Sequence, residues 1–352
     1  MGGFGIVYDP VFLKHDPGST HPESAYRLKV ILDEIENNEE LKSLVKFYPP
    51  DTATQEEVLW NHSKELYEEV EKTQGKPYTR FDPDTTANEY TFEAALKAVG
   101  AQKTGLKLLL EEEFDGVFCL VRPPGHHAEY DRAMGFCFFN NVAIAAHYAM
   151  NFYGLDRILI VDWDLHHGNG TQSAFYDSDK VLYFSIHQYP YYPGTGHYTE
   201  VGRGDGAGFT INVPVSAYSG DEEYFYAFET VLKPIAYQFK PQLILVSAGY
   251  DCCKDDPLGD MEVSPDKGIA ILTTVIKEIA DEFCNGKVLF TLEGGYNSEN
   301  LKKAFASTVF SFLRKFPFER IKVDEKRIER FKKEVIVPLK DFLSFRGYWE
   351  FY

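Results

Sequence analysis

Several features that define other protein classes are missing from this sequence of 352 residues. Its five cysteines form no Cys-x-x-Cys pair, so we expect free, mostly buried thiols and neither a disulfide framework nor a cysteine zinc site. No run of about 18 apolar residues occurs, and the first residues, MGGFGIVYDPVFLKH, lack a basic segment followed by an apolar one. We therefore predict a cytoplasmic protein that does not cross a membrane and has no export signal.

Positive charge is also scarce. The sequence has 36 Lys and Arg against 54 Asp and Glu, a formal net charge of -18. This balance disfavours direct binding to a nucleic-acid backbone and favours cationic substrates or partners through long-range attraction. Solubility alone is an equally good reason for an acidic surface.

No Ser/Gly-rich stretch, internal repeat or charge block marks a boundary, so we expect one domain over residues 1–352. Apolar runs rich in β-branched and aromatic residues predict buried strands at 116–121, 157–163, 181–187, 243–249 and 288–294. Helical periodicity predicts helices at 91–110, 139–152, 222–239, 265–283 and 299–315. Strands that alternate with helices indicate an α/β fold with a mostly parallel central sheet flanked by helices on both faces.

Polar residues gather where the predicted strands end. The segments are RPPGHHAEY after the first run, DWDLHHGNG after the second, SAGYD after the fourth and LEGGY after the fifth. In parallel sheets the ligand crevice lies beyond the carboxyl ends of the strands. Four strand ends therefore offer His, Asp or Tyr side chains to one crevice, which isolated core histidines would have no reason to do.

Asp164, His166 and Asp251 are the predicted metal ligands. The spacing of the first two places both side chains on one side of an extended segment. Asp251 ends another strand and can supply a third ligand, which leaves one coordination position open for water. Such a set accepts zinc, and iron(II) or cobalt(II) could also bind. A lone Asp-x-His pair is more often a cap or a surface pair, so the other strand ends carry this prediction.

Two adjacent histidines and a tyrosine complete the predicted site. His126 and His127 lie in a Pro/Gly-rich turn that can fix both imidazoles, and imidazole suits proton transfer near neutral pH. Asp162 and Asn169 flank the metal pair and are candidates to orient the two rings. Tyr296 follows paired glycines that let the backbone turn the phenol inward, where its hydroxyl can stabilise an oxyanion. The plainer alternatives are a core carboxylate for Asp162 and simple packing for Tyr296.

Taken together, these motifs resemble the histone deacetylase family, including bacterial histone deacetylase-like amidohydrolases and acetylpolyamine amidohydrolases. The matching segments, in the family's order, are HPE, RPPGHHA, GFCFFNN, VDWDLHHGNGTQ, YPGTG, SAGYD with DPLG, and LEGGY. The resemblance implies the arginase/deacetylase fold and one zinc ion held by Asp164, His166 and Asp251. An arginase-like pair of manganese ions is disfavoured, because Gly168 and Cys253 stand where the extra carboxylates would be.

The resemblance also implies roles for the other site residues. His127 would be the general base and acid, and His126 its electrostatic partner, hydrogen-bonded to Asp162. Tyr296 would polarise the substrate carbonyl, and Asn169, beside His127, resembles the class II branch of the family.

A substrate tunnel and potassium are implied in the same way. Gly135, Phe136 and Tyr192 match positions around the aliphatic stem of an acyl-lysine, with Leu258 at the rim and Asp84 matching a rim aspartate that holds the substrate backbone. Potassium would bind at a first site beside the zinc and at a second site near the start of strand 181–187. The implied residues are Asp162, Asp164, His166, Ser185 and Ile186 for the first site, and Phe175, Ser178, Val181 and Phe209 for the second.

The predicted function is therefore the hydrolysis of an acylated lysine in a peptide, or of a small acylated amine, by a metal-activated water. Acetylpolyamine hydrolysis is the nearest alternative, and a catalytically silent acyl-lysine binding module is another. The oligomeric state stays open. The aromatic end, FRGYWEFY, can pack on its own domain or on a neighbour, and we expect the former.

Overall fold

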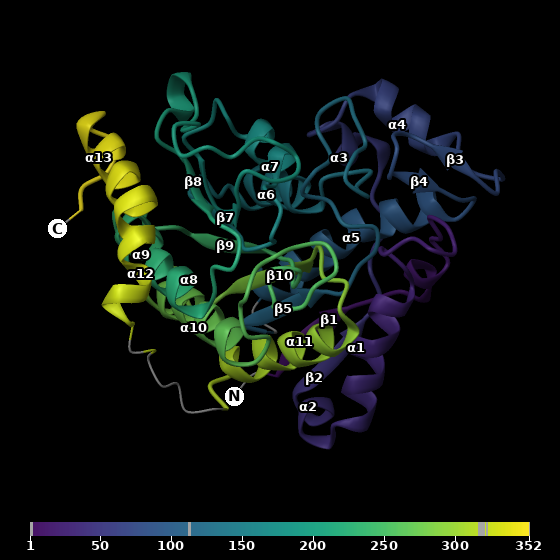
Figure 1. The fold of residues 1–352 in the computed structure, drawn as a ribbon. Helices are drawn as coiled ribbons and strands as arrows, with labels where there is room; N and C mark the ends of the chain where they lie inside the picture. Colours follow the sequence, from purple (N-terminus) through teal and green to yellow (C-terminus); the bar gives the residue numbers. More distant parts are fainter. Residues whose placement is uncertain (1–2, 112–113, 316–320, 322, 352) are drawn as a thin grey trace.

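The computed structural model describes residues 3–111, 114–315, 321 and 323–351. Within these residues, eight parallel strands form a central sheet in the order β2-β1-β5-β10-β9-β6-β7-β8 (Figure 1). Its strands are β1 (Phe4–Val7), β2 (Val45–Tyr48), β5 (Gly116–Cys119), β6 (Ile158–Asp162), β7 (Val181–Gln188), β8 (Thr210–Val215), β9 (Leu243–Ala248) and β10 (Val288–Leu292). A separate antiparallel pair consists of β3 (Thr79–Arg80) and β4 (Thr86–Ala87).

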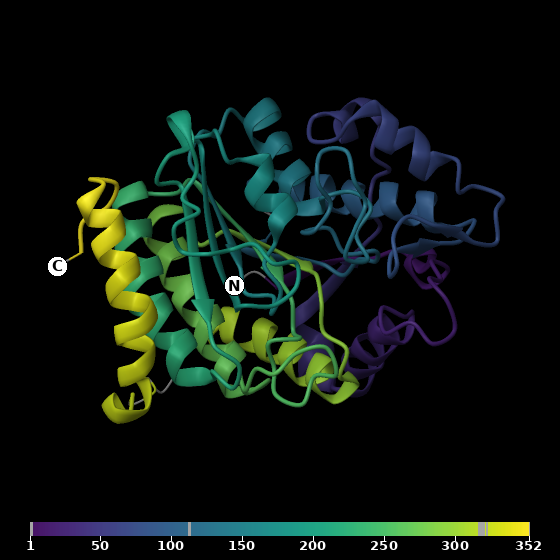
Figure 2. The ribbon, with the colours of Figure 1, turned by 45° about the horizontal axis from the view of Figure 1, so that its top comes forward.

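Helices cover both faces of the sheet, as Figure 2 shows from a second direction. One face carries α5 (Thr91–Leu110) and α6 (Asn141–Tyr153), which pack against each other and on β5 and β9. The other face carries α1 (Tyr26–Asn37), α11 (Ser298–Phe312), α10 (Lys267–Phe283), α8 (Asp221–Ala227), the π-helical η3 (Phe228–Leu232) and α9 (Lys233–Phe239). This arrangement confirms the predicted α/β fold, with a sheet that is entirely parallel.

Shorter elements surround this core. They are η1 (Pro10–Leu13), α2 (Glu39–Leu44), α3 (Gln55–Leu59), α4 (Lys64–Glu71), α7 (Asn169–Ala174) and η2 (Gly204–Gly206). After α11 the chain forms α12 (Glu325–Phe331), the π-helical η4 (Lys332–Ile336) and α13 (Val337–Phe345), and η4 contacts β8, the outermost strand. Trp349 donates its indole N–H to the carbonyl of Gly208 at 2.6 Å, so the aromatic end packs on its own chain, as expected.

The five predicted strands and five predicted helical segments are all present, and their ends agree with the prediction to within three residues. The central strands are recognisable because parallel strands covered on both faces are continuous apolar runs, and every residue of β5, β6, β7, β9 and β10 is buried. Three strands of the central sheet, and the small β3–β4 pair, were not predicted. β1 has only four residues, β2 exposes its two middle residues, and β8 contains Pro214, which an outermost strand tolerates.

The register of the sheet brings distant segments together at its carboxyl edge. Asp162, the last residue of β6, is paired with Ser247 of β9 on one side and with Ser185 of β7 on the other. The loops after these strands therefore begin side by side, together with the loop after β10. All five cysteines are free and buried, which confirms that prediction.

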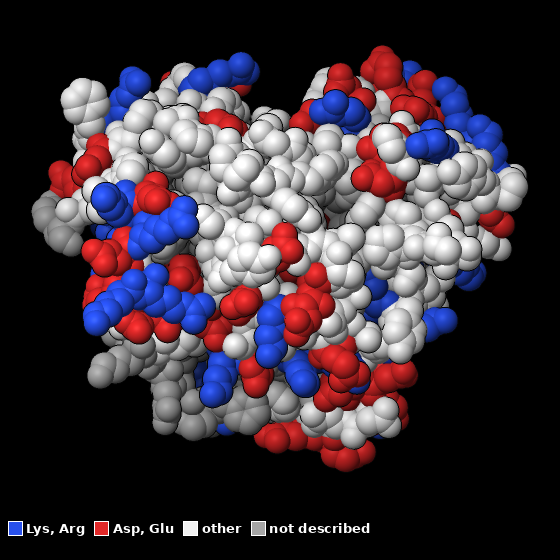
Figure 3. Space-filling model, in the orientation of Figure 1, with Lys and Arg blue, Asp and Glu red and all other residues white. Residues whose placement is uncertain are grey.

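The surface in Figure 3 mixes charges of both signs, with Lys and Arg interspersed among Asp and Glu over the region of α8, α12 and α13, and a largely uncharged area at the upper centre. Among the described residues, no helix combines the length and the apolar character that a membrane span requires.

Candidate active site

A cavity of about 290 Å³ opens at the carboxyl edge of the sheet. Its lining contains five of the eight residues predicted for the metal site and the catalytic set, together with all five predicted tunnel residues. The lining residues are Asp84, Pro124, His126, His127, Gly135, Phe136, Asp164, His166, Tyr191, Tyr192, Leu258, Gly294 and Tyr296. Asp251, Asp162 and Asn169 lie directly behind this wall, in contact with His166, His126 and His127 respectively.

Asp164, His166 and Asp251 converge at the base of the cavity. One ligand atom from each lies within 4.8 Å of the others. The Nδ1 atom of His166 is 3.2 Å from Asp164 Oδ1 and 3.1 Å from Asp251 Oδ2, although one ring N–H can donate well to only one of them. Backbone N–H groups hold the remaining oxygens: Gly294 donates to Asp164 Oδ2, and Leu165 donates to Asp251 Oδ1. Two buried carboxylates and one ring nitrogen are thus aimed at a common centre, and this oxygen-rich donor set fits a divalent cation.

Two glycines make room for these carboxylates. A Cβ atom at Gly249 would lie 2.0 Å from Asp164 Oδ2, and one at Gly294 would lie 2.2 Å from Asp251 Oδ2. Any larger residue at either position would displace a carboxylate. Gly249 and Gly294 are therefore part of the candidate metal site, together with the two carboxylates that they accommodate.

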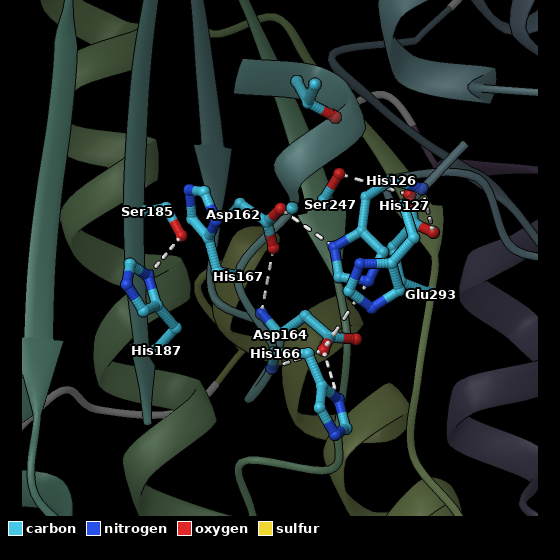
Figure 4. A network of polar contacts seen from close by, with 12 residues as sticks. His126, His127, Asp162, Asp164, His166, His167, Ser185, His187, Ser247 and Glu293 are labelled. Atoms are coloured by element: carbon cyan, nitrogen blue, oxygen red, sulfur yellow. Dashed lines mark hydrogen bonds and ion pairs between the residues drawn. The ribbon is translucent and has the colours of Figure 1, made fainter. Parts of the chain in front are cut away.

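His126 is buried and ion-paired. Its Nδ1–H donates to Asp162 Oδ2 at 3.0 Å, and Asp162 also accepts from the hydroxyl of Tyr183 and the backbone N–H of Asp164 (Figure 4). Burial disfavours the charged ring, but the carboxylates of Asp164 and Asp162 outweigh it and raise the pKa of His126 well above its ordinary value. The imidazole of His126 is therefore held in its cationic form.

His127 has an amide partner instead. Its Nδ1–H donates to Asn169 Oδ1 at 2.8 Å. Burial, followed by the positive charges of His126 and His166, lowers the pKa of His127 well below its ordinary value. The pKa values of these adjacent histidines, whose ring centroids are 4.0 Å apart, are thus shifted in opposite directions. The carboxylates of Asp164 and Asp162 outweigh burial at His126, whereas burial and the neighbouring positive charges dominate at His127.

Tyr296 closes the base of the cavity from the loop after β10. Burial raises its pKa well above its ordinary value, and the nearby carboxylates of Asp251 and Asp164 add to this, so the phenol keeps its proton. The guanidinium of Arg27 lies 4.9 Å from the ring centroid and donates from Nε to the carbonyl of Gly295 at 2.6 Å. The Asp256 carboxylate accepts from the backbone N–H of Tyr296 at 2.7 Å. The phenol is thus fixed through its ring and its backbone.

Glu293 is a further buried member of the site. Its Oε2 accepts from the backbone N–H groups of Gly125 and His126, and its Oε1 accepts from the Ser247 hydroxyl. Burial raises the pKa of this carboxyl to about 7. Glu293 therefore ties the histidine turn to the ends of β9 and β10.

The upper part of the cavity is aromatic. The Tyr192 ring lies 5.1 Å from the His127 ring, and the Phe136 ring lies 5.9 Å from the Tyr296 ring, each in an edge-on arrangement. At the rim, the carbonyl of Asp84 pairs with His21 Nε2 at 2.9 Å, and burial followed by Asp82 raises the pKa of the Asp84 carboxyl. Tyr191, which the sequence analysis did not select, also lies at this rim. The Tyr191 hydroxyl donates to the carbonyl of Leu258 at 3.2 Å.

The residues implied for potassium also lie near one another. Asp162 and Ser185 are register neighbours, and Ile186 follows on β7, so the first set gathers around the end of β6 and the adjoining middle of β7. The Ser185 hydroxyl is paired with His187 Nδ1 at 2.8 Å (Figure 4). In the second set, Phe175 accepts from the N–H of Ser178, and Phe209 accepts from the N–H of Tyr183, two residues after Val181.

Besides Tyr191, the sequence analysis missed four supporting residues of the site: Arg27, Glu129, Asp256 and Glu293. Arg27 reaches the site from a helix with no metal or catalytic pattern, and Glu129 lies in the RPPGHHAEY segment but has no recognisable role until the position of Asn169 is known. Glu293 could have been suspected, because a carboxylate at the end of a buried apolar run needs a partner.

Comparison with known proteins gives consistent results. A family model described as "Histone deacetylase domain" matches residues 21–311. The chain is 37% identical to a probable deacetylase of Archaeoglobus fulgidus over 84% of this chain and 82% of that protein. It is also 37% identical to the polyamine deacetylase HDAC10 of Danio rerio, over 88% of this chain and 48% of that protein. A crystal structure of the HDA15 HD domain superimposes with a TM-score of 0.86 at 34% identity, covering 97% of this chain and 98% of that one.

Proposed function

Because this chain belongs to the histone deacetylase family, whose matched members are deacetylases, we propose that it is a zinc-dependent deacylase acting on N-acetyl-lysine in a protein or peptide, or on a related acylated amine. One arrangement carries the proposal: three side chains that could hold a cation, two adjacent histidines with pKa values shifted in opposite directions, and a buried tyrosine meet at the base of one cavity.

Asp164, His166 and Asp251 would hold the zinc. When bound there, zinc would serve as a Lewis acid for the amide carbonyl and for water. The donor set fits because two buried carboxylates carry the charge that a divalent cation neutralises, and because backbone N–H groups already fix the other oxygen of each.

The chain's own residues would move the protons. Neutral His127 can accept a proton from an attacking water and return it to the leaving amine. His126, whose pKa the carboxylates of Asp164 and Asp162 raise, would supply positive charge next to His127. The protonated phenol of Tyr296 can donate to the oxygen that becomes negative in the tetrahedral transition state. No covalent bond to the protein is needed.

The cavity walls favour an extended, apolar substrate stem. Gly135, Phe136 and Tyr192 line the passage with a small residue and two rings, as an aliphatic chain with an acyl amide at its end requires. Leu258 contributes an apolar rim, and Asp84 a carboxylate that can accept an N–H from a substrate backbone. Acetylated polyamines are the second candidate class, since a relative carries the name polyamine deacetylase and the net charge of -18 favours cations.

Two further proposals concern the whole domain. Potassium ions would bind at the two residue sets named above and support the loops after β6 and β7. The catalytic domain would comprise residues 1–352. In support, β1 precedes the matched residues 21–311 but is a strand of the same central sheet, and η4 follows them but contacts β8.

The decisive experiment is an activity assay with purified, zinc-loaded protein. The panel contains acetyl-lysine peptides, longer acyl-lysine peptides and acetylated polyamines, each tested with and without chelator and with Tyr296→Phe as control. Zinc-dependent turnover that the Tyr296 variant loses would support the proposal and identify the substrate class. No turnover on any substrate by fully zinc-loaded, folded protein would overturn it in favour of a silent acyl-lysine binding module.

A further inference from the structure

Glu129 stands next to the histidine turn, on a tight turn of its own. Its backbone N–H donates to the carbonyl of Arg132 at 2.9 Å. Two groups from outside anchor this turn: His62 Nδ1 donates to the carbonyl of Glu129 at 2.8 Å, and the N–H of Ser63 donates to the carbonyl of Tyr130 at 2.7 Å. The backbone that carries the Glu129 side chain is therefore fixed.

The Glu129 carboxylate reaches the amide that faces His127. Asn169 Nδ2 donates to Glu129 Oε1 at 2.7 Å, a distance typical of a charge-assisted hydrogen bond. The other carboxylate oxygen accepts from Arg132 at 2.8 Å. Asn169 is buried, whereas the Glu129 side chain is 27% exposed and can be changed without opening the core.

This contact decides which way the Asn169 amide points. Its NH₂ group must face the acceptors, which are the Glu129 carboxylate at 2.7 Å and, more weakly at 3.4 Å each, the carbonyl of His127 and the sulfur of Met134. Its carbonyl oxygen is then turned to His127 Nδ1 at 2.8 Å. The reverse orientation would bring the amide oxygen against a carboxylate and present an NH₂ group to the ring.

The amide orientation in turn decides the tautomer of His127. Because Asn169 Oδ1 can only accept, the proton of the neutral ring must be on Nδ1. Nε2 is then the unprotonated nitrogen of a ring that lines the cavity. With the amide reversed, the ring would place its proton on Nε2 and could not accept one from water.

We propose that Glu129 is a positioning residue, which holds the Asn169 amide in the one orientation that keeps His127 in the Nδ1–H tautomer. This inference rests on the proposed function, in which His127 accepts a proton. His126 needs no such device, because its partner Asp162 is a carboxylate and accepts through either oxygen. The Asn169 amide adds no charge beside His127, but it can present either its oxygen or its NH₂ group to the ring. Glu129 fixes which of the two faces His127.

The kinetic test compares Glu129→Ala with Glu68→Ala, which removes a carboxylate from a solvent-exposed pair with Lys64 on α4. We expect Glu129→Ala to lower kcat about tenfold or more, with KM, zinc content and thermal midpoint close to those of Glu68→Ala. Glu129→Gln, which can still accept from Asn169, should keep most of the activity. A wild-type kcat in Glu129→Ala would overturn the inference. A loss of activity fully explained by a lower zinc content or a smaller folded fraction would also overturn it.

An exchange of the two functional groups gives a second, rescue-type test. Asn169→Asp alone places a carboxylate opposite Glu129 at the position of a 2.7 Å contact, so this variant should be strongly impaired. Adding Glu129→Gln restores a donor and an acceptor across the contact, and the double variant should be about tenfold more active than Asn169→Asp alone. A double variant no better than the single one would contradict the assignment.

A third measurement does not depend on turnover. Long-range ¹H–¹⁵N spectra of protein labelled at histidine report each ring's tautomer, with His127→Ala identifying the signal. We expect Nδ1–H for His127 in the wild type and a mixture in Glu129→Ala; an unchanged tautomer in that variant would overturn the inference whatever the kinetics. If the wild type is inactive on every substrate but shows the expected tautomers, the proposed function fails and the positioning role stands.

Discussion

Gly249→Ala tests the proposed metal site by crowding a ligand without touching its chemistry. The new Cβ atom would lie 2.0 Å from Asp164 Oδ2, and real Cβ atoms essentially never approach another heavy atom within 3.0 Å. The carboxylate must therefore move by about 1 Å, whereas metal–ligand distances hold to within about 0.2 Å. The same movement would break the hydrogen bond from the N–H of Gly294 to that oxygen. We expect zinc affinity to fall at least ~100-fold, or about 2.7 kcal/mol.

The assay is a zinc titration in competition with a chromophoric chelator, with thermal unfolding of the metal-free proteins measured in parallel. In Gly294→Ala the new Cβ atom would lie 2.2 Å from Asp251 Oδ2, so we expect a similar loss of zinc affinity. Gly154→Ala is the matched control: it strains a left-handed helix cap at φ 65°, yet its Cβ would meet nothing within 4 Å. It should lose about 1 kcal/mol of stability and no zinc affinity. Folded Gly249→Ala and Gly294→Ala proteins that both bind zinc like the wild type would refute the site.

Other expectations can be checked in the same preparations. Tyr296→Phe should lower kcat about 100- to 1,000-fold, because an oxyanion donor is lost, while elemental analysis should still find the full zinc content. Asp251→Ala should lose zinc on dialysis, since one of three donors is removed, and retained stoichiometric zinc would exclude its role as a ligand. Burial lowers the pKa of His62 to about 4 from an ordinary 6.5, and its Nε2 accepts from the N–H of Asn140. The neutral ring thus favours the folded state, so stability is complete above pH 6.5 and declines as the pH falls towards 4. The free energy of unfolding is measured in urea at several pH values. His62→Gln should reduce its decline between pH 6.5 and 4 by up to about 1.4 kcal/mol per pH unit, and an unchanged slope would contradict the role of His62.

The strands that position the site could be predicted from the sequence, because a parallel strand covered on both faces must be apolar along its whole length. β9, LILVSA, is the clearest example, and Asp251 follows it closely. Residues at strand ends then share one edge by topology alone, which is why Asp164, His166 and Asp251 could be grouped before any coordinates were known. The fold class needed nothing more than the alternation of strands and helices.

The supporting residues could not be predicted in this way. Arg27 reaches the carbonyl of Gly295 across 268 positions of sequence, and nothing in α1 distinguishes it from a surface arginine. Glu129 looks like an ordinary turn residue until the position of Asn169 is known. The predicted helix at 222–239 is another case, because periodicity does not reveal that a π-helical segment, η3, interrupts it before Pro234 of α9. Such features depend on which loops meet, and only the folded chain decides that.

The pairing of β6 with β9 has a consequence for when metal can bind during folding. Asp164 and His166 follow β6, whereas Asp251 follows β9, and β7, β8, α8 and α9 lie between them in the chain. The three donors meet only when β9 has paired with β6. A chain in which these two strands are not paired has no complete site, so zinc would stabilise the paired state, by about 2.7 kcal/mol at a free concentration 100 times its dissociation constant. In a refolding experiment, zinc capture would therefore report the pairing of β6 with β9.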